Sequence, residues 1–135
     1  MHRARSDMTL FSRDVYYVRI SPDLIVCRNV TAGLEHRQPA STPFTTQRLL
    51  VASFQPAVET LRTALRRTHR RSLLRPAMLL HPLERIDGGL SAIETRVLVE
   101  LAASVGAATC VVHVGPELSD REVIARIDGA ARSNR

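Results

Sequence analysis

The sequence contains no lysine and no tryptophan, and it has only two cysteines in 135 residues. Without lysine, Schiff-base chemistry and the phosphate-binding lysine of a P-loop are both excluded. Cys27 and Cys110 are too few and too far apart in the chain to form a disulfide framework. Because no CxxC or HExxH spacing is present either, we expect no structural metal site.

Long apolar runs are also missing. No stretch approaches the roughly 18 apolar residues that a membrane span requires, and residues 1–11 lack the apolar centre of a signal peptide. We therefore expect a cytoplasmic protein without a membrane span. The 44% hydrophobic and 24% charged residues are typical of one folded domain. We place that domain at residues 13–131, with a flexible extension over 1–12 and a frayed end over 132–135.

Positive charge is concentrated in one segment. The formal net charge is +6, and residues 62–75 contain arginines but no acidic residue. At helical spacing, Ala57, Val58 and Leu61 form an apolar face, and the arginines lie behind it. Aromatic residues, which single-strand binding uses as stacking platforms, lie outside the segment, so a solvated helix face is favoured over a nucleic-acid surface. The candidate basic surface comprises Arg62, Arg66, Arg67, Arg70 and Arg71.

The hydrophobic patterns predict five strands and three helices. Ser91 with Glu94, and Ser119 with Glu122, are capping boxes that begin the second and third helices. Apolar positions at helical spacing, among them Ile93 and Ile124, continue those helices. The expected strands cover 15–20, 24–30, 34–37, 77–81 and 109–114, and the expected helices cover 56–69, 92–105 and 120–131.

The order of these elements, βββαβαβα, predicts an α/β fold. Helical crossovers make strands one, four and five parallel, and hairpins place strands two and three antiparallel beside strand one. The expected sheet is therefore mixed and five-stranded in the order 3-2-1-4-5, which is a ribonuclease H-like topology. In that order Cys27 and Cys110 lie three strand spacings apart, about 14 Å, so we expect no disulfide between them.

Parallel strands one, four and five end at the same edge of the sheet, where open α/β sheets usually bind ligands. His81 and His113 end adjacent strands there, and this set has the chemistry for zinc binding or acid-base catalysis. In the alternative interpretation, each histidine only donates a hydrogen bond to a backbone carbonyl. The free N–H groups at the start of the helix after Gly88 and Gly89 could bind an anion, but the Ser91 cap already uses part of that capacity. We expect no catalytic residue and no cofactor. The candidate ligand edge comprises His81, Glu84, Asp87, Gly88, Gly89 and His113.

Two families resemble this sequence. The run RPAMLLHPLERIDGGLSAIETRVLVELAASVGAATCVVHVGPELSD, preceded by RLLVASFQPAVETLRTAL, resembles the first subdomain of MreB, the bacterial actin-like shape protein. More closely, TPFTTQRLLVASF and ERIDGGLSAIE are similar to the YjaA family of small bacterial stress-associated proteins. The resemblance implies an actin-like fold, and it aligns Glu94 with the water-activating glutamate of MreB. The capping box with Ser91 already accounts for a glutamate at position 94.

The departures from the actin-like pattern concern nucleotide binding. The Asp-x-Gly-Thr phosphate turn is replaced by Arg19-Ile20-Ser21-Pro22-Asp23, which has no glycine, and the second phosphate loop and the adenosine-binding half would lie beyond residue 135. We therefore expect a non-enzymatic protein that acts through protein–protein contacts in stress or envelope and cell-shape physiology. The alternatives are a nucleic-acid-associated protein and a small hydrolase. The partner is unidentified, and a homodimer through an open sheet edge remains a further option.

Overall fold

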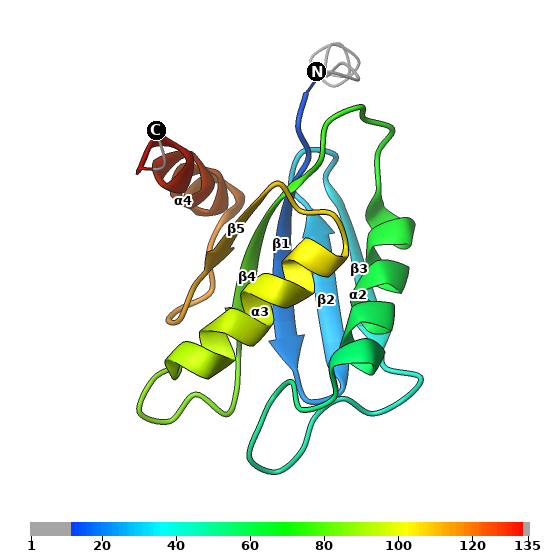
Figure 1. Cartoon of the computed structure of the whole chain (residues 1–135). Coiled ribbons are helices and arrows are strands. Elements are labelled where there is room, and N and C mark those ends of the chain that lie inside the picture. Colours follow the sequence, from blue (N-terminus) through cyan, green and yellow to red (C-terminus); the bar gives the residue numbers. More distant parts are fainter. Residues whose placement is uncertain (1–11, 134–135) are drawn as a thin grey trace.

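The computed structural model describes residues 12–133, so most of the expected extension over 1–12 lies outside the described residues. Residues 12–133 form a single mixed sheet in the order β3-β2-β1-β4-β5, with three helices packed on it (Figure 1). The strands are β1 (Val15–Ser21), β2 (Leu24–Asn29), β3 (Leu34–Pro39), β4 (Ala77–Pro82) and β5 (Thr109–Val112). The helices are α2 (Phe54–Thr68), α3 (Ala92–Ser104) and α4 (Asp120–Ser133).

The predicted sheet is confirmed in its strand order and strand directions. β1 pairs antiparallel with β2, and β2 pairs antiparallel with β3. β1, β4 and β5 run parallel, as the helical crossovers required. Cys27 on β2 and Cys110 on β5 are therefore separated by β1 and β4, and both are free thiols. Burial raises the pKa of Cys27 to about 12 and that of Cys110 to about 11.

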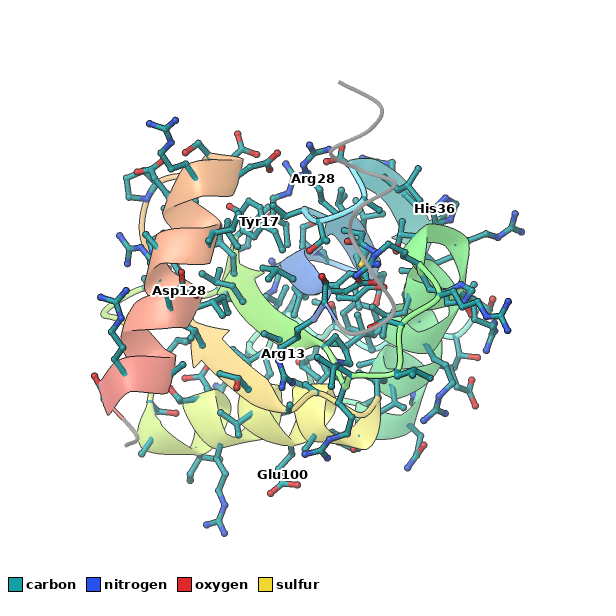
Figure 2. The ribbon with its side chains drawn as sticks, turned by 90° about the horizontal axis from the view of Figure 1, so that it is seen from above. Arg13, Tyr17, Arg28, His36, Glu100 and Asp128 are labelled. Carbon is teal, nitrogen blue, oxygen red and sulfur yellow. The ribbon has the colours of Figure 1, made fainter. Side chains whose placement is uncertain are left out.

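The two faces of the sheet are covered differently. α2 packs on β2 and β3, and α3 packs on β4 and β5, so one face carries the larger hydrophobic core. α4 packs mainly on β4 and β5, on the other face. Viewed from above, Tyr17 and Arg28 lie on the α4 side of the sheet, and His36 lies beside α2 (Figure 2). A smaller core under α4 contains Tyr17, Ala77, Leu79, Leu118, Val123 and Ile127.

Some element boundaries differ from the expectations. α2 begins at Phe54, so Pro56 is its third residue and not its first. The first four N–H groups of a helix have no intrahelical acceptor, so proline is tolerated there as well. α2 ends at Thr68, one residue before the expected end at residue 69. α4 extends to Ser133, past residue 131, where the sequence placed the end of the folded domain.

Two apolar helix positions do not face the core. Ile93 is 77% exposed and Ile124 is 41% exposed, although the helical pattern included both in the apolar sets. The first turn of α3, which contains Ile93, extends past the end of the sheet (Figure 1). Only part of each apolar stripe meets the sheet, and Leu98, Leu101 and Ala102 are the buried residues of α3.

Candidate functional site

The structure brings the two candidate histidines together. His81 lies in β4 and His113 directly follows β5, and their ring centroids are 4.6 Å apart in an edge-to-face arrangement. Both side chains are buried, His81 with only 1% of its surface exposed. The parallel pairing of β4 with β5 produces this contact, because it places equivalent strand ends side by side.

Both ring nitrogens of His81 have hydrogen-bond partners. Nε2 lies 2.8 Å from the Gly115 carbonyl oxygen, and Nδ1 lies 2.7 Å from the Tyr17 hydroxyl. A carbonyl oxygen only accepts, so Nε2 carries the proton and the Tyr17 hydroxyl donates to Nδ1. The Tyr17 oxygen in turn accepts the Leu118 N–H at 3.1 Å. This chain of bonds connects β1, β4 and the loop before α4.

His113 makes a similar bond. Its Nε2 donates to the Pro116 carbonyl oxygen at 2.8 Å. The two histidines therefore fix the loop over residues 115–118. They bond the carbonyl oxygens of Gly115 and Pro116, which lie past the end of β5 and outside its ladder. Burial lowers the pKa of His81, and the nearby His113 lowers it further, whereas the bond to Gly115 opposes this shift. A buried neutral imidazole is the form that these bonds require.

The other residues of the candidate ligand edge lie in the exposed loop between β4 and α3. Glu84 pairs with its neighbour Arg85 at 3.2 Å, and the hydrogen bonds of the two histidines go to other groups. Asp87 is exposed in the same loop. Gly88 and Gly89 have φ values of +76° and +89°, a backbone region that strongly favours glycine. These glycines therefore shape the loop.

The N-terminus of α3 is closed by its own side chains. Ser91 Oγ accepts the Glu94 N–H at 3.1 Å, and the Glu94 carboxylate accepts the Ser91 N–H at 3.1 Å. The predicted capping box is confirmed, as is the second one between Ser119 and Glu122 at α4. The Glu94 carboxylate is therefore already hydrogen-bonded within the capping box.

The turn between β1 and β2 is hydrogen-bonded to a loop that lies about twenty residues further along the chain, a contact that the sequence did not predict. Asp23 has a φ of +53°, and its carboxylate accepts the N–H groups of Phe44 at 2.7 Å and Thr45 at 2.9 Å. The Asp23 N–H donates to Thr45 Oγ1 at 3.0 Å. Thus the turn that would correspond to a phosphate cradle contacts the loop after β3. The Thr-Pro-Phe-Thr-Thr run was the available signal, because threonine hydroxyls commonly bond turn backbone.

The candidate basic surface divides into different environments. Arg62 donates to the Ser104 carbonyl oxygen of α3 at 3.0 Å, and Arg66 donates to Thr63 Oγ1 at 3.1 Å. Arg67 and Arg71 are exposed. Arg70 instead forms a 2.7 Å ion pair with the buried Asp14 and also donates to the Ser12 carbonyl oxygen. Arg70 is therefore a structural residue, which the helical pattern did not reveal because α2 ends at Thr68.

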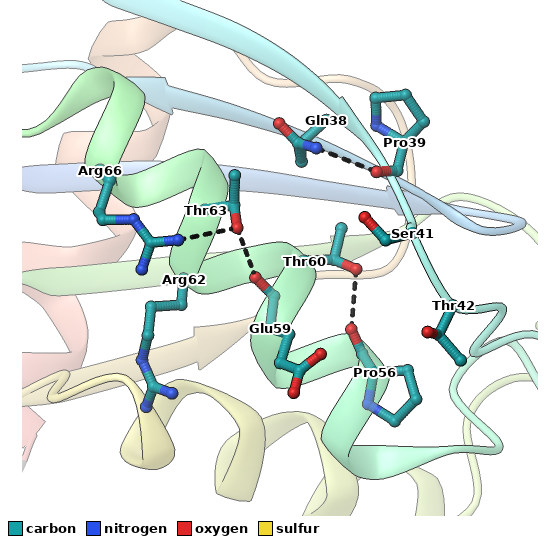
Figure 3. A pocket seen from close by; sticks show the side chains of 10 residues that line it. All are labelled: Gln38, Pro39, Ser41, Thr42, Pro56, Glu59, Thr60, Arg62, Thr63 and Arg66. Atoms are coloured by element: carbon teal, nitrogen blue, oxygen red, sulfur yellow. Dashed lines mark hydrogen bonds between the residues drawn. The ribbon is translucent and has the colours of Figure 1, made fainter.

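A polar pocket lies between α2 and the end of β3, beside Arg62 and Arg66 (Figure 3). Its volume is about 240 Å³, and Thr60 of α2 lies across it from Ser41. The Thr60 hydroxyl donates to Pro56 and the Thr63 hydroxyl donates to Glu59, both within the helix. The two threonine hydroxyls therefore already donate hydrogen bonds to backbone carbonyl oxygens of α2.

An apolar depression, the edge groove, lies at the end of β4 on the α3 face of the sheet, whereas the histidine cluster is on the α4 face. It has a volume of about 70 Å³ and lies between the first half of α3, the loop before α2 and the end of β4. The exposed Ile93 and the half-buried Val97 also border a second, more open hollow beside Phe54. The apolar side chains of the edge groove are Leu49, Leu50, Val51, Pro82, Leu90, Ile93, Val97 and Leu98.

Three comparisons with known proteins were negative. No protein-family model, no curated protein and no solved structure matches this chain. Within residues 12–133, there is no cluster of three or more His, Cys, Asp or Glu side chains arranged to hold a metal ion. None of the helices in the same region is long and apolar enough to cross a membrane.

Proposed function

We propose that this chain is a non-catalytic, actin-like binding protein that acts through contacts with a protein partner in bacterial stress or cell-shape physiology, without binding ATP. One observation carries the proposal. At the sheet edge where an α/β protein would bind its ligand, Tyr17 and the two histidines are hydrogen-bonded within the chain, while an apolar groove on the α3 face at the end of β4 is open.

The proposal of an actin-like or ribonuclease H-like subdomain is supported by the topology. A 3-2-1-4-5 sheet with parallel β1, β4 and β5 is the arrangement expected for that fold. The absence of nucleotide binding is supported by the first turn. Pro22 has no N–H to offer a phosphate, and the Asp23 N–H already bonds Thr45.

The nucleic-acid alternative has less support from the geometry. Of the five arginines on which it relies, Arg70 pairs with Asp14 and Arg62 bonds the end of α3. The aromatic side chains that stack on bases are missing from the segment. A protein surface is favoured because large exposed apolar side chains, Leu49 and Ile93, border the edge groove.

Calorimetry with ATP and Mg²⁺ tests the non-catalytic part of the proposal. We expect no heat beyond that of mixing and no release of phosphate. Micromolar binding of ATP, or any turnover, would contradict the proposal directly.

Site-specific photocrosslinking in cells tests the contact surface. A photoreactive amino acid at Ile93 should capture a protein partner, and the same amino acid at Ile124 on α4 is the matched control, because that residue is also apolar and exposed. Equal crosslinking from both positions, or none from Ile93, would count against the edge groove as the contact surface.

A further inference from the structure

A second surface lies at the other end of the molecule, where α2 ends and the first described residues begin (Figure 1). The loop from α2 to β4 reads Arg71-Ser72-Leu73-Leu74-Arg75 in its central part. Leu73 is 68% exposed and Leu74 is 39% exposed, so two neighbouring leucines face solvent between two arginines. Large apolar side chains exposed together and surrounded by charge are typical of interaction sites.

Most of the charged residues in and beside this loop are arginines. Arg13 donates to the Arg75 carbonyl oxygen, which brings a further arginine to the loop, and Arg67 lies in the last turn of α2. Asp14 is the acidic residue that lines the neighbouring pocket, and Arg70 pairs with it at 2.7 Å. Residues 60–83 contain no aspartate or glutamate. We call the set Arg13, Arg67, Arg71 and Arg75 the arginine pole.

The loop is held firmly at its base. Besides the Arg70 ion pair, the Ser72 hydroxyl donates to the Ser12 carbonyl oxygen at 2.8 Å, and the Leu74 N–H donates to Ser72 Oγ at 3.2 Å. Asn29 supports the same region, because its side-chain amide bonds both Asp14 and the Thr68 carbonyl oxygen. A loop fixed in this way presents its leucines with little conformational entropy left to lose on binding.

A pocket of about 220 Å³ lies directly beside Leu74. Its apolar wall is made by Leu65 of α2, Leu74, Pro76 and Val105, which follows α3. The pocket is large enough to receive one branched or aromatic side chain. An anionic bilayer contacts protruding side chains and needs no such pocket, and DNA or RNA would gain little from exposed leucines. A protein segment uses both the leucines and the pocket.

We propose that the arginine pole binds an acidic, amphipathic segment of a protein partner. One apolar side chain of that segment fills the pocket beside Leu74, further apolar side chains cover Leu73, and carboxylates pair with Arg71, Arg75 and Arg13. This surface is separate from the edge groove, because the two hollows share no lining residue. The recognition mode is a helix laid on an apolar surface, with charges that fix its orientation.

The probe is a synthetic peptide with leucines at i and i+4 helical spacing and glutamates at the flanking positions, followed by fluorescence anisotropy. The peptide should bind, and the affinity should fall as salt rises. The double variant Arg71→Glu, Arg75→Glu should weaken binding by roughly tenfold or more. Arg121→Glu together with Arg126→Glu on α4 is the matched control, with the same change in net charge and the expected affinity of the wild-type protein.

The contribution of the exposed leucines is tested with the variants Leu73→Ser and Leu74→Ser, and Ile124→Ser is their control. A peptide whose leucines are replaced by serine tests the same contact from the other side. Loss of binding in the first two variants and with the serine peptide supports the proposal. Circular dichroism checks folding, and the more exposed Leu73 keeps the test valid if Leu74→Ser unfolds. Equal binding of the serine peptide, or no effect of the Arg71 and Arg75 reversals, would overturn it.

Vesicles of phosphatidylglycerol and a DNA duplex serve as competing probes. Tighter binding to either one than to the peptide at the same ionic strength would overturn the assignment to a protein segment. This outcome is independent of the proposed function, because crosslinking from Ile93 reports on the edge groove alone.

Discussion

The two ends of the sheet each contain a polar cluster, but the two clusters differ in accessibility. At one end, Tyr17 bonds His81, His113 packs edge-to-face on His81, and both histidines bond backbone carbonyls of the loop that covers them. At the other end, Arg70 and Asp14 form a buried pair, but the neighbouring arginines and leucines stay exposed. The comparison shows that residue types alone do not define a site. What matters is whether their hydrogen-bonding groups are already used within the chain.

The ion pair under the arginine pole should have the largest effect on stability. Asp14→Ala removes the carboxylate that pairs with Arg70 and also removes one acceptor of the Asn29 amide. Breaking a buried pair by removing one partner commonly costs about 3 kcal/mol or more. We therefore expect a loss of about 3 kcal/mol in the free energy of unfolding, measured by urea denaturation. Arg66→Ala is the control, because that residue is exposed. An equal loss in both variants would contradict the account.

Removing the Tyr17 hydroxyl from the histidine cluster should lower the free energy of unfolding. Tyr17→Phe leaves His81 Nδ1 without its donor and the Leu118 N–H without its acceptor. Leaving buried polar groups unsatisfied costs about 1–3 kcal/mol, so we expect destabilisation by about 2 kcal/mol. Tyr16→Phe is the matched control, since its hydroxyl has a longer 3.4 Å contact with Asn29. A neutral Tyr17→Phe variant would show that the cluster is open to water.

The histidine cluster should also make stability depend on pH. Burial lowers the pKa of His81 below its ordinary value of 6.5, so the unfolded chain binds a proton more readily than the folded one. The contribution of this residue is complete above pH 6.5 and is lost as the pH falls toward the folded-state pKa. Denaturation curves measured across this range should show falling stability in the wild type and a flatter profile in His81→Asn. Identical pH profiles would contradict this prediction.

The smallest effect is expected at the exposed loop. Leu73→Ser should change the free energy of unfolding by no more than about 0.5 kcal/mol, because the side chain is mostly in solvent. Thermal denaturation followed by circular dichroism measures this change. A large loss of stability would mean that Leu73 packs against the chain and is not available to a partner.

Local patterns in the sequence predicted most of the fold. Helical periodicity, two capping boxes and the alternation of strands with helices were sufficient for the strand order, because crossover direction follows from element order. Ile93 and Ile124 were placed on the core faces wrongly, since periodicity identifies an apolar stripe but not how far the sheet extends beneath it.

The interactions within the site were harder to predict. The contact of His81 with His113 followed from strand order, but the Tyr17 bond that fixes the His81 proton depends on side-chain orientation between strands. The pairing of Asp14 with Arg70 joins residues 56 positions apart, and the hydrogen bond between Asp23 and Thr45 joins a turn to a loop. No local spacing predicts contacts of this kind, because loop conformation decides them.

The proposed function requires that the histidine end takes no part in chemistry and that a partner binds the exposed surface. Its most direct test is a ¹⁵N NMR titration of the histidine rings, with and without ATP and Mg²⁺. The account predicts that His81 is neutral with its proton on Nε2, that its pKa lies below 6.5, and that neither nucleotide nor metal changes its signals. A His81 ring that titrates at or above 6.5, or shifts when ATP and Mg²⁺ are added, would contradict it.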